Sequence, residues 1–188
     1  MPKDIFEIRF HSRAGQGAKS AAQLIAEAAL DEGKYIQSYP EYGPERAGAP
    51  MRAFVRISKK PIKTYASIKN PDVIIIIDSS LLNKEIIHGA TNDTILLVNT
   101  CECVDTVKKL TGFQGKIYTL NATEIALEVI GQDYPNTPIV GALIKITDIV
   151  NLKTITDRVK RFFLEKQKYE AAQTNILAIK RGYMGVKE

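Results

Sequence analysis

Several residue types that build active sites are scarce in this sequence. It has no tryptophan, and only two histidines and two cysteines among 188 residues. His11 and His88 lie far apart, outside any zinc-type motif. Cys101 and Cys103 supply at most two ligands, whereas an iron–sulfur cluster needs about four, and their spacing is poor for a disulfide. No Gly-x-Ser-x-Gly nucleophile elbow is present. We therefore expect no metal site and no self-sufficient catalytic centre in this chain.

Long apolar runs are also missing. A membrane-spanning helix needs about 18 consecutive apolar residues, and the clearest apolar run, Val73–Ile77, has the length of a strand. The opening residues Met1-Pro2-Lys3-Asp4 lead at once into a strand pattern, without the features of a signal peptide. These patterns favour a cytoplasmic protein that does not associate with a membrane.

The excess of positive charge is confined to one end of the chain. The net charge is +5, and residues 151–188 hold nine Lys and Arg against four Asp and Glu, which accounts for all of it. These basic residues are spread over predicted helix faces without aromatic residues between them, so we expect a solvated face or an acidic partner subunit, and no nucleic acid. The length and a hydrophobic content of 45% fit one globular domain over residues 1–188.

The first part of the chain has the pattern of an α/β unit. A short strand and a glycine turn precede an alanine-rich helix with apolar residues on one face, which ends at Gly33. This order is the opening of a dinucleotide-type unit. A turn at Ser58–Pro61 predicts an antiparallel hairpin, because the connection is too short for a crossover helix. The predicted strands here are Ile5–Phe10, Tyr35–Tyr39, Met51–Ser58 and Ile62–Tyr65.

The rest of the chain adds buried strands and then helices only. Strands at 72–78 and 94–99 are apolar on both faces, which is typical of the middle of a covered parallel sheet. The remaining predicted elements are a strand at 116–120 and helices at 79–87, 104–110, 122–131, 140–147, 156–163 and 169–183. Together these patterns predict a single Rossmann-like α/β domain: a twisted, mostly parallel sheet with a short antiparallel hairpin, helices on both faces and a helical C-terminus.

Two glycine-rich loops are the candidate binding elements. Gly15-Gln16-Gly17 opens the first helix, and residues 40–50 hold three prolines that exclude a regular helix or a central strand. A loop of this length is usually functional, and we expect it to face the glycine turn. The dinucleotide fingerprint is incomplete, because Ser20 stands in place of the third glycine. The open interpretations of the turn are a ligand or partner contact, a tight helix start, and NAD binding with Glu41 at the ribose.

Polar residues at strand ends have both a functional and a structural interpretation. Asp78-Ser79-Ser80 and Asn99-Thr100 follow the two central strands, where ligands gather in α/β sheets. Side chains of these types also cap helices, and capping is the simpler interpretation. His11 ends the predicted first strand beside the glycine turn. It is either a proton donor or, more simply, a hydrogen-bonded residue of the strand end.

Three stretches together resemble a known family. They are Arg13–Gly17 before the alanine-rich helix, Tyr39–Pro50, and Ala53–Ser58. They closely resemble the gamma subunit of pyruvate:ferredoxin oxidoreductase, and the resemblance continues through residues 136–143 and 175–183. The sequence departs from the family pattern at Ala14, often glycine, and at Ala47, often arginine. The full Pro-Glu-Tyr-Gly-Pro-Glu-Arg form leans toward pyruvate, not 2-oxoglutarate.

The resemblance implies a subunit of a heteromeric, oxygen-sensitive enzyme of anaerobic metabolism. Such an enzyme oxidatively decarboxylates a 2-oxo acid, forms the acyl-CoA and reduces ferredoxin. Thiamine diphosphate, its magnesium and the iron–sulfur clusters are implied to belong to alpha, beta and delta-type partner subunits, and none is expected in this chain alone. The implied cofactor contacts are Gly15, Gln16 and Gly17. The implied contacts to a partner or to CoA are Arg13, Glu41, Tyr42, Gly43, Pro44, Glu45, Arg46 and Gly48.

Within the second loop, specific roles follow as hypotheses. Arg46 would pair with an acidic group of a partner or with an anionic ligand such as a CoA phosphate. Glu41 and Glu45 would hold Arg46 or lock the interface, and the prolines would stiffen the loop before docking. The alternatives are the gamma subunit of a related 2-oxoglutarate or branched-chain enzyme, a free-standing nucleotide-binding α/β protein, and a pure scaffold. We also expect that the isolated chain is able to self-associate through its partner-binding surface.

Overall fold

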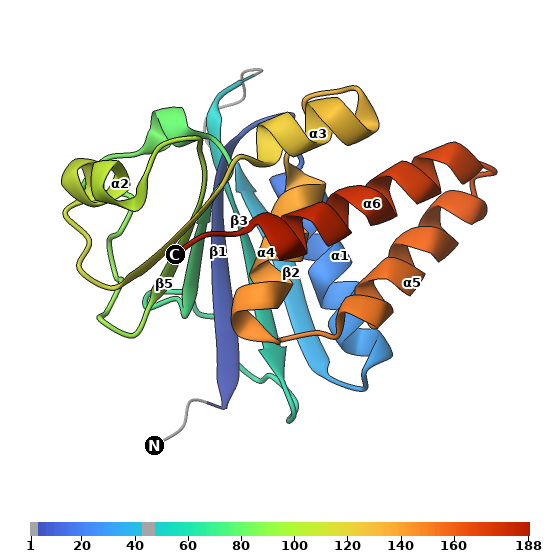
Figure 1. Cartoon of the computed structure of the whole chain (residues 1–188). Coiled ribbons are helices and arrows are strands. Elements are labelled where there is room, and N and C mark those ends of the chain that lie inside the picture. Colours follow the sequence, from blue (N-terminus) through green and yellow to red (C-terminus); the bar gives the residue numbers. More distant parts are fainter. Residues whose placement is uncertain (1–3, 43–47) are drawn as a thin grey trace.

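The computed structural model describes residues 4–42 and 48–188, and Figure 1 shows its arrangement. A six-stranded sheet runs through the molecule in the order β2-β3-β1-β4-β5-β6. β1, β4, β5 and β6 run parallel to one another, whereas β3 is antiparallel to both β1 and β2. The predicted mostly parallel sheet is therefore confirmed. The strands are β1 (Ile5–Arg13), β2 (Tyr35–Tyr42), β3 (Pro50–Ser58), β4 (Val73–Ile76), β5 (Ile95–Asn99) and β6 (Lys116–Leu120).

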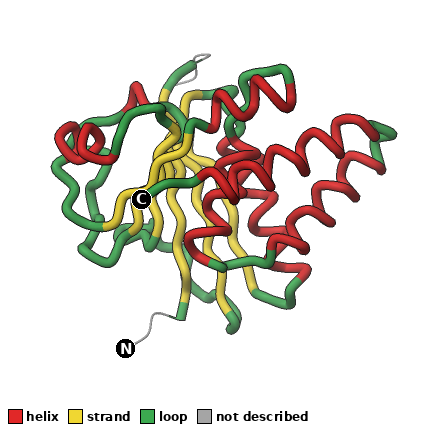
Figure 2. Tube along the Cα trace, viewed as in Figure 1, coloured by secondary structure: helices red, strands yellow, loops and turns green. Residues whose placement is uncertain are grey.

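Helices cover both faces of the sheet, as Figures 1 and 2 show. α2 lies on one face of the sheet, and the other five helices pack on the opposite face. The last four elements of the chain, α3 to α6, are all helices. The helical C-terminus is thus confirmed. The helices are α1 (Ala18–Asp31), α2 (Val104–Thr111), α3 (Ala122–Ile130), α4 (Asn136–Thr147), α5 (Leu152–Leu164) and α6 (Tyr169–Gly185), with a 3-10 turn, η1, at Ser79–Leu81.

The two cores follow directly from strand alternation. Val73 and Ile75 of β4 point to the larger core, and Ile74 and Ile76 point to the smaller core beside α2. Successive side chains of a strand face opposite sides of a sheet, so a strand that is apolar throughout contributes side chains to the cores on both sides. On the larger side, α1 presents buried alanines to the sheet, and these small side chains let the helix lie close to it.

The predicted hairpin after Ser58 is wrong. Residues 61–65 form no strand, and β3 instead pairs with β1 along nine residues and with β2 along eight. Both hydrogen-bonding edges of β3 are therefore occupied, and no edge remains for the segment that follows it. The antiparallel hairpin of this fold is β2–β3, and the proline-rich loop is its connection.

Other expected boundaries also differ in the structure; α4 and α5, for example, each begin four residues before the predicted 140 and 156. β2 continues past Tyr39 through Pro40, which is tolerated because β2 is an edge strand and one side of it needs no donor. The helix predicted at 79–87 is only the 3-10 turn η1. Beyond η1, the Asn83 side chain accepts hydrogen bonds from the backbone N–H groups of Glu85 and Ile86, a local arrangement that competes with helix formation.

No helix among the described residues is both long and apolar enough to cross a membrane.

Candidate functional site

The glycine turn and the base of the proline-rich loop lie side by side. The register of β1 on β3 places Arg13 opposite Pro50, so the end of one strand adjoins the start of the other. The Ala14 N–H donates to the Ala49 carbonyl over 2.9 Å. A guanidinium N–H of Arg13 donates to the Gly48 carbonyl over 3.2 Å. The expectation that these two loops face each other is confirmed for the described residues.

A polar network joins this pair of loops to the end of β4; we call it the Arg13–Asp78 network. Gln16 donates from Nε2 to Asp78 over 2.7 Å, and its Oε1 accepts from the Arg13 N–H over 2.7 Å. The Arg13 Nε lies 3.3 Å from the Asp78 carboxylate. Arg13 also donates to the Ser80 hydroxyl over 3.0 Å and 3.2 Å. The network thus contains the sequence-predicted Arg13 and Gln16, and Arg13 connects it to the carbonyl of Gly48.

Asp78 is held in its charged form by this network. Burial by itself raises the pKa of this carboxyl, but hydrogen bonds from Ser80 and Gln16, with the nearby positive charge of Arg13, outweigh it. The pKa therefore lies below its usual value. Asp78 also accepts the Ser80 N–H over 2.9 Å and so caps η1, which confirms the capping interpretation for the end of β4.

Backbone conformation and close packing explain why the turn at residues 15–17 contains two glycines. Gly15 and Gly17 have φ of +102° and +82°, a region that other residues rarely adopt. A Cβ at Gly17 would lie 2.7 Å from the Asn136 side chain at the start of α4, whereas a Cβ at Gly15 would meet nothing within 4 Å. Gly17 is therefore fixed by its neighbours, and Gly15 remains open on its outer side.

On the face of the sheet that carries the larger core, the glycine turn lines part of a groove of about 870 Å³. Leu24, Val159 and Phe163 give its apolar lining, and Asn136 and Asn175 give amides. Asn175 accepts a hydrogen bond from the Thr137 hydroxyl over 3.0 Å. Both asparagines lie in the stretches that carry the family resemblance. The residues that resemble the family therefore line this groove as well as forming the two loops.

The proline-rich loop leaves the sheet from a braced base. Glu41 of β2 and Arg52 of β3 lie opposite each other and form an ion pair. Tyr42, the last residue of β2, is 57% exposed. Gly48, the first described residue after the loop, has a φ of +78°. The predicted contacts Gly43, Pro44, Glu45 and Arg46 lie outside the described residues.

His11 is not a strand-end residue, because β1 continues to Arg13. Its Nε2 is buried and has no hydrogen-bond partner among the described residues, so the expected hydrogen-bonded histidine is wrong. Burial, and then the positive charges of Arg9 and Arg52, lower the pKa of His11 to about 3. The imidazole is therefore neutral near pH 7, which gives no support to the proton-donor interpretation.

The second strand end is structural. Asn99 accepts the N–H groups of Ala122 and Thr123 at the start of α3, and its own amide donates to the Ile77 carbonyl and the Thr123 hydroxyl. This confirms the capping interpretation. In the described parts of the chain, no group of three or more His, Cys, Asp or Glu residues is placed to hold a metal ion.

The topology gives no support to the NAD alternative. A dinucleotide unit returns its second strand parallel to the first, but β2 pairs only with β3 and is antiparallel to it. Glu41, the candidate ribose acceptor, is paired with Arg52. The glycine turn is a tight helix start within a different topology.

Sequence reasoning missed two partners of the glycine turn. Asp78 was considered only as a strand-end residue, and Asn136 only as part of the resemblance. The position of Asp78 after a buried parallel strand was the available signal, because neighbouring parallel strands end at the same edge. The contact of Asn136 with Gly17 depends on how α4 packs, and no local pattern indicates it.

Comparisons with known proteins agree with this geometry. The family "Pyruvate ferredoxin/flavodoxin oxidoreductase" matches residues 7–184. Pyruvate synthase subunit PorC of Thermotoga maritima is 51% identical, covering 98% of this chain and 96% of the relative. The common gamma subunit of the pyruvate/ketoisovalerate oxidoreductases of Thermococcus kodakarensis is 44% identical over 85% of this chain and 87% of its own length.

A solved structure shares the whole fold. The crystal structure of pyruvate oxidoreductase subunit PORC from Thermotoga maritima has a TM-score of 0.90 and 50% identity, with 98% of both chains covered. The chain therefore belongs to the pyruvate ferredoxin/flavodoxin oxidoreductase family.

Proposed function

We propose that this chain is the gamma subunit of a pyruvate:ferredoxin oxidoreductase complex. The complex would oxidatively decarboxylate pyruvate with CoA, giving acetyl-CoA and CO2, and pass the electrons to ferredoxin. The observation that carries the proposal is 51% identity across nearly the full length of a pyruvate synthase subunit. The proposal places the complex in the cytoplasm.

In this proposal the chain contributes surfaces, and its partners contribute the redox and thiamine chemistry. Alpha, beta and delta-type subunits would hold thiamine diphosphate with its magnesium and the iron–sulfur clusters. The chain's own residues fit this division, since its two cysteines are too few to ligate a cluster. Thiamine diphosphate supplies the stabilisation of the carbanion formed on decarboxylation, and the residues of this chain would shape and close the pocket around it.

The surface for this task is the edge where the two loops meet. The Arg13–Asp78 network holds the glycine turn, and the Arg13 and Ala14 contacts to Gly48 and Ala49 hold the returning end of the loop. The Glu41–Arg52 ion pair braces the other side. A loop with a fixed base loses less conformational entropy on docking. Proposed contacts to a partner or to CoA are Tyr42 and Gly48, with Gly15–Gly17 beside them.

Arg13 and Glu41 act in this proposal by positioning, because each is already paired within the chain. Arg46 remains the proposed direct contact to an anionic group, on sequence grounds. Arg46→Ala in the assembled complex is expected to raise the KM for CoA or weaken assembly. An unchanged KM, turnover and subunit ratio would remove the role given to Arg46.

The central test is co-expression of all four subunits with a tag on this chain. We expect alpha, beta and delta-type chains to co-purify, and pyruvate to reduce ferredoxin only when CoA is present. Parallel assays with 2-oxoglutarate and branched-chain 2-oxo acids decide between this proposal and the related enzymes. A complex that is equally active without this chain would overturn the proposal.

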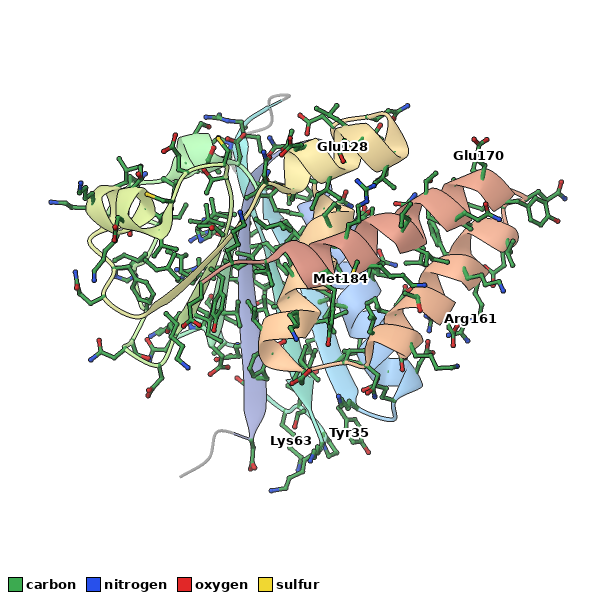
Figure 3. All side chains as sticks on the ribbon, viewed as in Figure 1. Tyr35, Lys63, Glu128, Arg161, Glu170 and Met184 are labelled. Carbon is green, nitrogen blue, oxygen red and sulfur yellow. The ribbon has the colours of Figure 1, made fainter. Side chains whose placement is uncertain are left out.

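The docking surface is tested with a matched pair of exposed residues. Tyr42→Ala removes an aromatic side chain of the kind that anchors interfaces and is expected to weaken assembly about tenfold, or about 1.4 kcal/mol. Lys63→Ala, at the opposite end of the sheet in Figure 3, is expected to assemble like the unmodified chain. Equal effects of the two substitutions would place the interface elsewhere.

A further inference from the structure

The loop between β5 and α2 carries both cysteines of the sequence. Cys101 and Cys103 are free and exposed, and they are separated by Glu102. Neither takes part in the Arg13–Asp78 network or in any of the capping contacts described above. Two accessible thiols one residue apart form a cluster of nucleophilic groups for which the proposed function has no use.

Cys103 stands where a thiolate is favoured. It is the N-cap residue of α2, and its carbonyl accepts the N–H groups of Thr106 and Val107 over 3.1 Å and 3.3 Å. Its Sγ lies 3.4 Å from the Thr106 hydroxyl, which can donate to a thiolate. The positive end of a helix and N–H donors stabilise a thiolate there.

The direction of the pKa shift of Cys103 agrees with this position. The Thr106 hydroxyl, and after it the Thr106 backbone N–H, lower the pKa of this thiol, while the charge of Asp105 opposes them. The thiolate is the reactive form of cysteine. Because Cys103 is exposed, small oxidants can reach it, so the start of α2 both activates this thiol and presents it to solvent.

The second thiol, that of Cys101, is two residues away in the sequence. Cα atoms two residues apart are at most about 7 Å from each other, and the chain bends at Cys101 and Glu102, where the Glu102 N–H donates to the Thr100 hydroxyl. A disulfide needs Cα atoms about 4.4–6.8 Å apart. The spacing is poor for a disulfide, so a bridge formed here would be strained and exposed, and disulfides of that kind are easily reduced.

We propose that Cys103 and Cys101 form a peroxide-reactive dithiol that closes reversibly to a disulfide. The Cys103 thiolate attacks one oxygen of hydrogen peroxide, the O–O bond breaks, and hydroxide leaves as the sulfur becomes a sulfenic acid. The Cys101 sulfur then attacks Cys103 Sγ, the S–O bond breaks, and the proton of Cys101 leaves with the hydroxide as water. Two thiols and one peroxide thus give one disulfide and two waters, and a dithiol reductant reverses the change.

The intervening glutamate gives a direct assay on the full-length chain. After treatment with hydrogen peroxide and blocking of free thiols, trypsin releases the peptide Glu85–Lys108, and a glutamate-specific protease then cleaves after Glu102. We expect the two fragments to stay joined until a reductant is added, with the protein monomeric on a non-reducing gel. Fragments that separate without reductant, or a disulfide-linked dimer as the only product, would overturn the proposal.

Single-cysteine variants form matched controls. With Cys101→Ser, Cys103 is expected to stop at the sulfenic acid, trapped by a dimedone probe, and to alkylate about threefold to tenfold faster than Cys101 does in Cys103→Ser. Serine is a good N-cap residue, so Cys103→Ser keeps the start of α2. Thr106→Val is expected to slow Cys103 alkylation several-fold. Equal rates for the two cysteines would remove the activated role of Cys103.

Discussion

At the scale of single residues, two separate constraints require glycine at position 17. Its φ of +82° disfavours any side chain, and the Asn136 side chain occupies the place of a Cβ. The first constraint belongs to the turn, and the second belongs to the docking of α4 against it. A substitution at Gly17 therefore reports on local conformation and tertiary packing together, and a control is needed to separate them.

We expect Gly17→Ala to lower the free energy of unfolding by about 2–4 kcal/mol, since strain in the left-handed region and a close contact add. Gly33→Ala is the matched control, because Gly33 has φ of +76° with nothing within 4 Å of its would-be Cβ, and it should cost about 1–2 kcal/mol. Urea unfolding measures both. If Asn136→Ala does not reduce the cost at Gly17 toward that at Gly33, the contact with Asn136 is not part of the effect.

At the scale of elements, α4 and α6 pack closely enough to require glycine. A Cβ at Gly182 of α6 would lie 2.0 Å from the Pro138 carbonyl oxygen of α4, and one at Gly141 would lie 2.0 Å from the Ile179 carbonyl oxygen. Each helix thus presents a glycine to the backbone of the other. α6 runs through Gly182 because this packing offsets the weak helix propensity of glycine.

Alanine at Gly182 should therefore destabilise the protein, although alanine normally favours a helix by about 1 kcal/mol over glycine. We expect a loss of about 2–4 kcal/mol as the two helices are forced apart. Gly185→Ala is the control in the same helix, because its Cβ would meet only the ends of the Leu120 and Ile125 side chains. Thermal unfolding measures both variants, and similar midpoints for the two would show that α4 and α6 can separate at little cost.

A second link between elements joins the end of α1 to the start of α5. The Glu32 carboxylate accepts the Asn151 N–H over 2.7 Å and pairs with the Lys34 ammonium at 2.9 Å. Burial by itself raises the pKa of Glu32, but the Asn151 backbone, Lys34 and further side-chain donors outweigh it and lower the pKa to about 2. Because the folded-state pKa lies below the usual 4.5, the stabilisation is fully present above that value and is lost as the pH falls toward 2.

Glu32→Gln is accordingly expected to lower the stability by about 1–2 kcal/mol at pH 7, with the difference from the unmodified chain closing between pH 4.5 and 2. Chemical unfolding at several pH values measures this difference. Asp157→Asn, which removes an exposed ion pair with Lys153, serves as the control and should change little at any pH. A difference in the free energy of unfolding between Glu32→Gln and the unmodified chain that does not change with pH would contradict a charged Glu32 carboxylate.

At the scale of the whole molecule, the end of the chain returns to the sheet. Lys187 exchanges two backbone hydrogen bonds with Thr119 of β6, at 2.8 Å and 2.9 Å, and Val186 packs against the larger core. Figure 1 shows the C-terminus beside the sheet, after α6 has crossed the helical layer. These last residues therefore cover part of the outer edge of β6 and anchor α6.

Removal of residues 186–188 is expected to lower the stability by about 1–3 kcal/mol, through the lost hydrogen bonds and the exposure of Val186. It also uncovers an edge strand, which favours self-association. Lys187→Ala keeps the backbone bridge and should behave like the unmodified chain. Urea unfolding with size-exclusion chromatography measures both effects, and an unchanged midpoint for the truncated chain would show that the bridge contributes nothing.

Local sequence patterns determined most of the elements. Apolar alternation located β4, β5 and β6, helical spacing located the C-terminal helices, and the alanine-rich face of α1 indicated close packing. These signals are short-range, because each follows from the period of a single strand or helix. The loop motif and the glycine turn also pointed to the family to which the chain belongs.

Tertiary structure decided how these pieces are joined. β3 inserts between β1 and β2, which displaced the predicted hairpin, and the end of β4 brings Asp78 to Gln16 and Arg13. Strand order and register depend on contacts between residues far apart in the sequence, and no local period encodes them. The sequence by itself therefore determined the elements and the two loops, whereas only the packed sheet determined that the loops share one edge and which side chains hold them there.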